Sequence, residues 1–397
     1  RKNISILIAS RPVFLLLAVL AWNCIFSSAA AQSVFTEKDT CGLRISLLTC
    51  TPGQELYSIF GHTAIRVTDA SSDLVFNYGT FQFNEPDFYT KFVRGKLAYF
   101  LSVENFADFE YAYRWEQRGI TEQVLSLTCK EKEDLFRALI VNAQESNKYY
   151  KYDFLFDNCT TRAGDIIINN NQKKLATGNI LGGNSPTFRE LLHIYLDKGG
   201  MAWSKLGIDI LLGSRIDREV TKKEYMFLPD NLMWGMDSTK SETGSIVLNK
   251  SVILEQTWKP GNPPIDPVWW FMIPSLLLLL ASYRSRSNYH RWQKIMDRFF
   301  FSLLGMMGIL LTFMWWGTDH ASCRDNYNLL WCLPTHLLFI WLPKSSENLQ
   351  KKYFLAIAGL QILLLLSWPF LPQDLNRGLI PIVVLAAVRS LMIARKK

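Results

Sequence analysis

The stretch at residues 152–162 reads YDFLFDNCTTR and decides how the rest of the chain is interpreted. Asp157 and Asn158 are residue types that cap helix N-termini through their side-chain oxygens. They predict a helix over 159–169 with Cys159 in its first turn. At that position, unpaired backbone N–H groups and the positive end of the helix dipole lower the pKa of a thiol and can hold an oxyanion. The alternative for Cys159 is a buried structural thiol.

A second run, FGHTAIRV at residues 60–67, places His62 at the start of a predicted strand. Gly61 precedes it and permits the close approach of another group. A histidine on a strand and a cysteine at a helix N-terminus form the arrangement of a nucleophile and its base. His193 is expected on a helix, as an ordinary surface or packing residue.

The segments around these residues predict an α+β domain. Ile65–Val67 and Leu74–Tyr78 flank a turn-rich stretch and predict a hairpin. The other expected elements are helices over 106–115, 130–144 and 185–235, a strand over 121–127, and a link to the membrane over 236–262.

The hairpin also predicts which residue orients His62. If it is centred near residue 71, positions i and about 142−i lie opposite each other. Thr80 then faces His62, and Tyr78 lies on the same face of the sheet two residues away. Tyr78 is therefore the predicted partner, and a slip of one residue favours Asn77 instead.

The C-terminal third of the chain is apolar and basic. Residues 1–260 carry 29 Lys and Arg against 29 Asp and Glu, whereas residues 261–397 carry 14 against 6. This placement excludes a nucleic-acid-binding basic face and indicates a membrane domain with charged loops. Five transmembrane helices are predicted, over 267–283, 299–316, 328–343, 353–371 and 379–394.

The charged loops also predict the orientation of these spans. With residues 32–260 outside, the inner loops and tail hold eleven Lys and Arg and the outer loops hold two. Arg389 lies near the inner end of the last span and is expected to snorkel. The aromatic stretch 99–115 and the helix over 186–197 are the expected contacts of the outer domain with the bilayer.

The first 31 residues have the pattern of a secretory signal. A basic start, an apolar stretch and an A-x-A site precede Gln32. An uncleaved anchor helix is the alternative.

Seven cysteines are present, and export permits disulfides. Cys41 and Cys50 are spaced to pair, as are Cys323 and Cys332, and Cys129 is expected to be structural. If Cys159 is not the nucleophile, Cys50 is the next candidate.

The order of His62 before Cys159 resembles the circularly permuted papain-like fold of the NlpC and lecithin–retinol acyltransferase groups. Several further runs resemble the Lnb family of lipoprotein N-acyltransferases from Bacteroides-type bacteria. They are SLLTCTPG at 46–53, NYGTF at 77–81, KFVRGKL at 91–97, DNCTTR at 157–162, GIDILLG at 207–213, FLP at 227–229 and the loop from Thr318 to Trp331.

The resemblance implies four parts: a signal peptide over 1–31, a papain-like catalytic domain over 32–175, a helical extension and linker over 176–260, and a five-helix transmembrane domain over 261–397. It implies an enzyme of the bacterial inner membrane, with its catalytic domain in the periplasm and its C-terminus in the cytoplasm. Cys159 would take an acyl chain from a phospholipid as a thioester and pass it to the α-amine of a diacylated lipoprotein.

The resemblance further implies substrate-binding roles for Asn158 and Arg162. Asp319 and His320, in a short outer loop, are expected to bind a lipid head group or to support the catalytic pair, unless that loop is simply solvated. No metal, cofactor or nucleic acid is expected, since the chain has neither a Gly-rich phosphate loop nor a clustered His/Cys ligand set. Three other classes stay open: a phospholipase, a thiol amidase or peptidase of the cell envelope, and a non-catalytic subunit.

Overall fold

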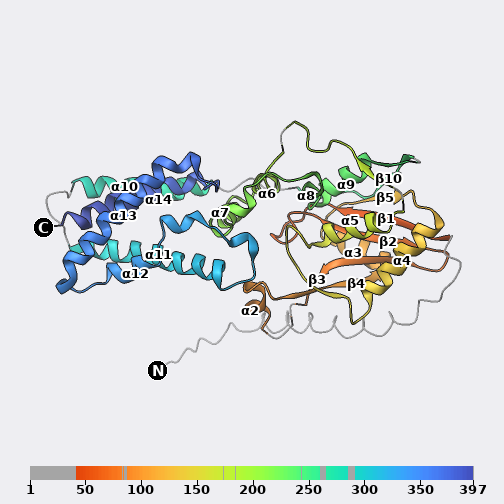
Figure 1. Ribbon diagram of the computed structural model, residues 1–397, viewed down its shortest axis with the longest axis horizontal. Coiled ribbons are helices and arrows are strands. Elements are labelled where there is room, and N and C mark those ends of the chain that lie inside the picture. Colours follow the sequence, from red (N-terminus) through yellow and green to blue (C-terminus); the bar gives the residue numbers. More distant parts are fainter. Residues whose placement is uncertain are drawn as a thin grey trace, which may run out of the picture. The chain divides into compact units, whose positions relative to one another are not determined.

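A seven-stranded antiparallel sheet forms the centre of the N-terminal half of the protein, as a computed structural model shows (Figure 1). The strand order is β10-β5-β1-β2-β3-β4-β6. The strands are β1 (Arg44–Cys50), β2 (His62–Thr68), β3 (Asp73–Thr80), β4 (Ala98–Asn105), β5 (Ile120–Leu125), β6 (Tyr149–Lys151) and β10 (Val247–Leu254).

The structure describes residues 42–82, 84, 87–172, 174–183, 185–242, 244–259, 265–284 and 291–396. The predicted signal segment, Cys24 and Cys41 lie outside these ranges. Residues Leu43–Lys397 group into one compact unit.

The predicted hairpin is confirmed as β2–β3, but its register is shifted by one residue. Ile65 pairs with Phe76, so opposite positions sum to 141. The turn sets this register, because the Asp69 carboxylate accepts the backbone N–H groups of Ser71 and Ser72. A one-residue shift turns the opposite side chains of β3 toward His62.

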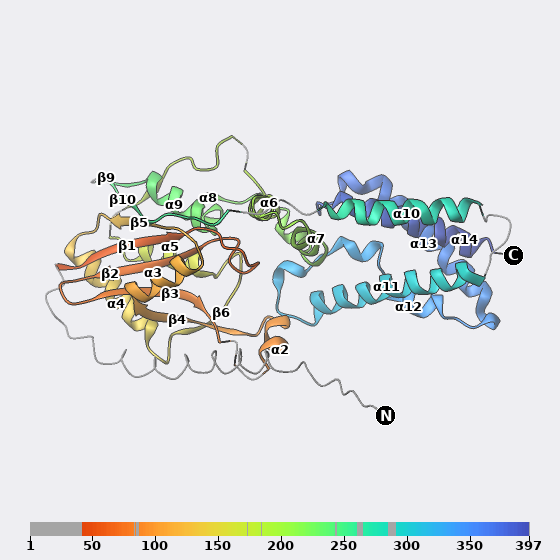
Figure 2. The same ribbon diagram turned by 180° about the vertical axis from the view of Figure 1, so that it is seen from behind.

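Helices cover both faces of the sheet, as the alternation along its central strands requires. Leu47 and Phe76 point into the core shared with α4 and α5, whereas Leu48 and Val75 point toward α3. The helices are α2 (Phe88–Val93), α3 (Phe106–Trp115), α4 (Cys129–Ala143), α5 (Cys159–Asn169), α6 (Phe188–Lys198), α7 (Ala202–Leu211), α8 (Lys222–Tyr225) and α9 (Pro229–Ser238) (Figure 2). The helices predicted over 106–115, 130–144 and 159–169 and the helical region 185–235 are therefore confirmed.

The predicted link over 236–262 is wrong for most of its length. Residues Val247–Leu254 form β10, which pairs with β5 at the edge of the main sheet. Shortly before it, β8 (Thr239–Ser241) and β9 (Gly244–Ser245) join β7 (Ala176–Thr177) in a small three-stranded sheet. The polar composition that predicted a linker belongs to an edge strand with most of its side chains exposed.

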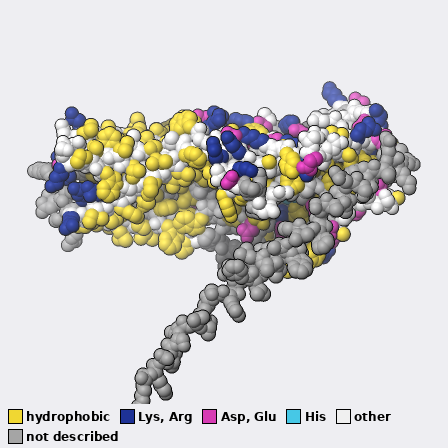
Figure 3. All heavy atoms as spheres, turned by 90° about the horizontal axis from the view of Figure 1, so that it is seen from below, with side chains coloured by type: hydrophobic (Ala, Val, Ile, Leu, Met, Phe, Trp, Pro, Cys, Tyr) yellow, Lys and Arg dark blue, Asp and Glu magenta, His cyan; other side chains and the backbone are white. Residues whose placement is uncertain are grey.

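The C-terminal region is a group of apolar helices with a hydrophobic surface (Figure 3). The helices are α10 (Pro267–Arg284), α11 (Arg291–Trp316), α12 (Thr335–Ile340), α13 (Glu347–Ser367) and α14 (Ile380–Ala394). Three segments of the described chain are long and apolar enough to cross a membrane: Arg291–Trp316, Lys344–Phe370 and Arg377–Ala394. In α10, Pro267–Ser282 is a shorter apolar helix.

The predicted span over 328–343 is not a continuous helix. It consists of a 3-10 turn at Tyr327–Leu330 and the six-residue α12. The segment still runs along α11, because Cys332 lies against Gly308 and Leu337 lies against Gly305. Irregular backbone is tolerated at membrane depth where protein covers it, and two glycines of α11 provide the room.

Arg389 does not snorkel. Its side chain is 4% exposed and forms two hydrogen bonds to the Asp297 carboxylate, at 2.6 and 2.8 Å, and one to Ser282. The arginine of α14 thus ties α11 and α10 together.

A buried polar junction joins the two halves. Asp209 of α7 accepts hydrogen bonds from Arg189 and His193 of α6 and from Asn376, which precedes α14. The amide of Asn328 also donates to the backbone oxygen of Asp209. His193, expected to be an ordinary helix residue, belongs to this junction.

Candidate functional site

Helix α5 begins at Cys159 because Asn158 caps it. The Asn158 side-chain oxygen accepts the backbone N–H groups of Thr160 and Thr161, each at 2.8 Å. Its amide nitrogen donates to the backbone oxygens of Phe154 and Phe227. The capping prediction is confirmed. Asn158 also lines the cavity beside Cys159, but it is buried and its polar groups are bound within the protein, so its role in substrate binding stays a prediction.

The same cap uses two of the first-turn amides that were expected to hold an oxyanion. The N–H groups of Thr160 and Thr161 point to Asn158 rather than to a substrate. The N–H of Cys159 itself is the first-turn amide that the cap leaves unused.

His62 and Cys159 are brought together by the packing of α5 against β2 and β3. Burial of Cys159 would raise the pKa of its thiol. The charge of His62, its hydrogen bond to the sulfur and a hydrogen bond from the backbone N–H of Thr63 outweigh burial and lower that pKa to about 7. Burial in turn lowers the pKa of His62, but the thiolate and Asn77 outweigh it and raise that pKa. A partly buried thiolate–imidazolium pair is the form that this environment favours.

Asn77, and not Tyr78, orients His62. The His62 Nε2 atom lies 2.5 Å from the side-chain oxygen of Asn77. The Asn77 amide nitrogen donates to a Glu104 carboxylate oxygen at 3.2 Å. The Tyr78 hydroxyl instead accepts a hydrogen bond from Asn142, in the core beside α4.

The Asn77–Glu104 contact fixes the chemistry of the imidazole. Because an ionised carboxylate only accepts, Glu104 keeps the amide nitrogen of Asn77 on its own side and turns the carbonyl oxygen toward His62. His62 must then donate through Nε2, which leaves Nδ1 for the thiol proton. Sequence reasoning missed Glu104, because β3 and β4 come together only in the folded sheet.

A cavity of about 820 Å³ opens beside this pair. Its wall contains Cys159, His62 and Asn77 and many apolar side chains. The apolar part includes Phe60, Phe81, Phe92, Leu97, Tyr99, Phe154, Ile208 and Leu212. The cavity also reaches residues 319–323, which follow α11, so it extends from the thiol to the outer end of a predicted span.

Asp319 and His320 both line the cavity, whereas Arg162 does not. Asp319 accepts a hydrogen bond from Lys151 of β6 at 2.9 Å, and His320 Nε2 lies 3.1 Å from the backbone oxygen of Phe92. Arg162 binds the Asp157 carboxylate through two hydrogen bonds, and its guanidinium lies 3.5 Å from the ring centre of Tyr150. Its predicted role in substrate binding is therefore wrong.

The other cysteines do not compete with Cys159. Cys50 is a free, fully buried thiol, and burial raises its pKa to about 12, which removes it as a second nucleophile. Because Cys50 is a free thiol, its predicted disulfide with Cys41 is wrong. Cys323 and Cys332 are free, so their predicted pairing is also wrong, while Cys129 is disulfide-bonded.

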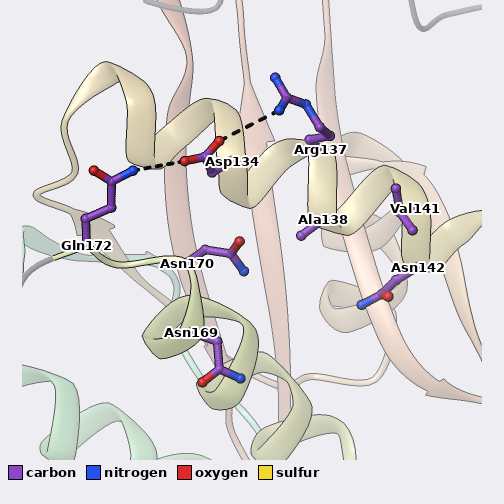
Figure 4. A pocket seen from close by; sticks show the side chains of 8 residues that line it. All are labelled: Asp134, Arg137, Ala138, Val141, Asn142, Asn169, Asn170 and Gln172. Atoms are coloured by element: carbon purple, nitrogen blue, oxygen red, sulfur yellow. Dashed lines mark hydrogen bonds and ion pairs between the residues drawn. The ribbon is translucent and has the colours of Figure 1, made fainter.

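A second pocket, of about 420 Å³, lies between α4 and the end of α5 (Figure 4). Asp134 is its central charge, with Gln172 and Arg137 on either side. No cysteine or histidine lines it. Within the described ranges, no cluster of His, Cys, Asp and Glu is arranged to hold a metal ion.

The fold and the site define a class of protein: an α+β domain with a thiol–imidazole pair at an apolar cavity, attached to a helical membrane domain. Residues 33–193 match the Lnb N-terminal periplasmic domain, and residues 259–397 match the Lnb transmembrane domain. The chain belongs to the Lnb family, which is a family of lipoprotein N-acyltransferases. Comparisons with curated proteins and with solved structures gave no match.

Proposed function

We propose that the protein is a lipoprotein N-acyltransferase that uses Cys159 as its nucleophile. The observation that carries the proposal is the Cys159–His62 pair, with a thiol pKa of about 7, at the wall of a cavity that reaches the loop after α11. A thiolate available near neutral pH beside an apolar cavity suits the attack on the ester of a lipid.

The first half-reaction transfers the acyl chain to sulfur. His62 takes the proton of Cys159 through Nδ1, and the thiolate attacks the carbonyl carbon of a phospholipid acyl ester. The N–H of Cys159 is the proposed donor to the oxyanion. The C–O bond then breaks, and His62 returns its proton to the leaving alkoxide of a lysophospholipid.

The second half-reaction passes the acyl chain to nitrogen. The α-amine of a diacylglyceryl-cysteine lipoprotein attacks the thioester carbonyl and the C–S bond breaks. The proton lost by the amine returns to the His62–Cys159 pair, which restores the starting state. Neither half-reaction requires a redox partner or a nucleotide.

The triple of Cys159, His62 and Asn77 supports a permuted papain-like fold for the catalytic domain. Papain-like enzymes place a cysteine, a histidine and an asparagine in these roles. Here His62 precedes Cys159 in the chain, which is the permuted order. We further propose that the protein lies in the inner membrane of a bacterium with its C-terminus in the cytoplasm.

The proposal is tested by the mass of the purified full-length enzyme after mixing with phospholipid vesicles. We expect one acyl chain on Cys159 without any acceptor, removal by neutral hydroxylamine, and no adduct on Cys159→Ala. Adding a diacylated lipoprotein should then move the label to its N-terminal peptide. Label released as free fatty acid in the presence of acceptor would identify a phospholipase, and acceptor acylation without any adduct would refute the role of Cys159.

A further inference from the structure

The short helix α2 and the turn after it, residues 88–97, form a lip beside the cavity. The exposed side of the lip is unusually apolar for a protein surface: Tyr89 is 80% exposed, Phe92 51% and Val93 42%. Basic side chains accompany these residues, because Arg94 and Lys96 are also exposed. Apolar side chains bordered by cations are typical of segments that lie in a membrane interface.

Hydrogen bonds tie the lip to the outer end of α11. The backbone N–H of Asp319 donates to the oxygen of Arg94 at 3.0 Å, and the ring of His320 binds the oxygen of Phe92. Gly95 has φ +67°, and a Cβ there would lie 3.3 Å from the His320 ring. Asp319 lies only three residues after Trp316, the last residue of α11.

The attachment fixes the level of the lip relative to the membrane. Trp315 and Trp316 stack on each other with ring centres 4.4 Å apart, and tryptophans at the end of a span lie at the membrane–water interface. A segment bound within a few residues of these tryptophans lies at the same level. Its exposed aromatic side chains then meet lipid instead of water.

The lip is also part of the cavity wall. Phe92, Gly95 and Leu97 line the same cavity as Cys159. An acyl chain that leaves the bilayer at α2 therefore reaches the thiol through the same cavity.

We infer that residues 88–97 insert into the outer leaflet of the surrounding membrane and form the entrance through which a phospholipid acyl chain reaches Cys159. The occupant of this surface is the lipid interface, because the lip is hydrogen-bonded to the loop that follows a membrane span and its cations complement lipid phosphates. The inference extends the proposed function by naming the route of the acyl donor.

The two bilayer contacts that the sequence predicted stay predictions. Phe106 and Phe109 of α3 and Phe188 and Leu192 of α6 are buried in core clusters. On the other sides of these helices, Tyr111 is 68%, Trp115 80% and Ile194 44% exposed.

The membrane contact is measured with a nitroxide label at position 89 in the full-length protein, reconstituted in lipid nanodiscs. The variant is Tyr89→Cys in a Cys159→Ala background; the other free thiols of the described chain are buried and resist labelling. We expect the label to collide more often with oxygen than with a water-soluble nickel chelate. The matched control is Leu248→Cys on β10, where Leu248 is 71% exposed. Its neighbour Val247 pairs with Leu125, whereas the catalytic pair lies toward the other end of β5, at Ile120. If the labels at positions 89 and 248 collide equally often with the nickel chelate and equally often with oxygen, the inference is overturned.

The entrance role has a separate readout that does not depend on labelling. The double substitution Tyr89→Glu and Val93→Glu should slow acyl loading of Cys159 from vesicle phospholipid about tenfold. The double variant should load from a water-soluble short-chain ester at the wild-type rate. The control Leu248→Glu should load from both the vesicle phospholipid and the short-chain ester at the wild-type rate. Equal loading from vesicles by the double variant and the wild type would refute the entrance. Failure of the wild type to load from either donor would instead refute the proposed function.

Discussion

Replacing His62 by alanine tests whether the imidazole is what stabilises the Cys159 thiolate. The interactions of Cys159 lower its pKa from 9.0 to about 7, a difference of about 3 kcal/mol in favour of the thiolate. The thiolate is therefore present above about pH 7 and is lost as the pH falls through that value. In His62→Ala the burial of the sulfur persists without its counter-charge, so the pKa should be 9.0 or higher.

The expected effect on reactivity follows from these pKa values. At pH 7 about half of the wild-type Cys159 is thiolate, against about 1% in His62→Ala. A thiolate of higher pKa is intrinsically more nucleophilic, by about six- to tenfold over this interval. The net result is an alkylation rate about five- to tenfold slower at pH 7, with the midpoint of the pH profile moved from about 7 to 9 or above.

The assay is the pH dependence of iodoacetamide labelling, with the modified peptide identified by mass spectrometry. Cys159→Ala gives the blank. His193→Ala is the matched control, because His193 binds Asp209 and is not among the groups that shift the pKa of Cys159. Its midpoint should stay near 7. A midpoint near 7 in His62→Ala, or one at 9 in the wild type, would show that the pair does not form.

Three further outcomes are expected. Asn77→Ala should lower the rate of acyl loading without changing the affinity for phospholipid. Glu104→Gln should lower the rate less, because a neutral amide holds the orientation of Asn77 less strictly than a carboxylate does. Wild-type loading rates in both variants would show that Asn77 and Glu104 do not orient His62. Gly308→Ala should lower the melting temperature in detergent by several degrees, since a Cβ there would lie 1.9 Å from the backbone oxygen of Cys332 and overpacking costs about 1–3 kcal/mol. Gly359→Ala in α13, where nothing lies within 4 Å, is its control and should be neutral or stabilising, and a matching loss in both would point to a general helix effect. A reporter that is active only in the cytoplasm should give a signal when it is fused after Lys397. A signal from a reporter that is active only in the periplasm would overturn the proposed orientation.

The position of the nucleophile was predictable because its signals are local. A capping asparagine, a cysteine one residue later and an apolar periodicity are sufficient to predict α5. The hairpin carrying His62 and the long apolar helices were predictable for the same reason, since turn composition and hydropathy act over a few residues.

The partner of His62 was decided by one residue of register. The Asx turn at Asp69 shortens the hairpin relative to the predicted centre, which exchanges Tyr78 for Asn77 at the imidazole. Neither residue type nor periodicity distinguishes these two neighbours, because both fit a strand.

The sequence by itself determined the class of the protein: an α+β domain with a cysteine at a helix N-terminus, a histidine on a strand, and a basic, apolar membrane region. The tertiary structure alone decided that β10 completes the sheet, that Glu104 fixes Asn77, that the segment packed against Gly308 is a broken helix, and that α2 is bound to the loop after α11. The physical reason is the range of the interactions. Caps, turns and apolar periodicity act between near neighbours in the chain, whereas strand pairing, glycine contacts and buried hydrogen bonds join segments that only folding brings together.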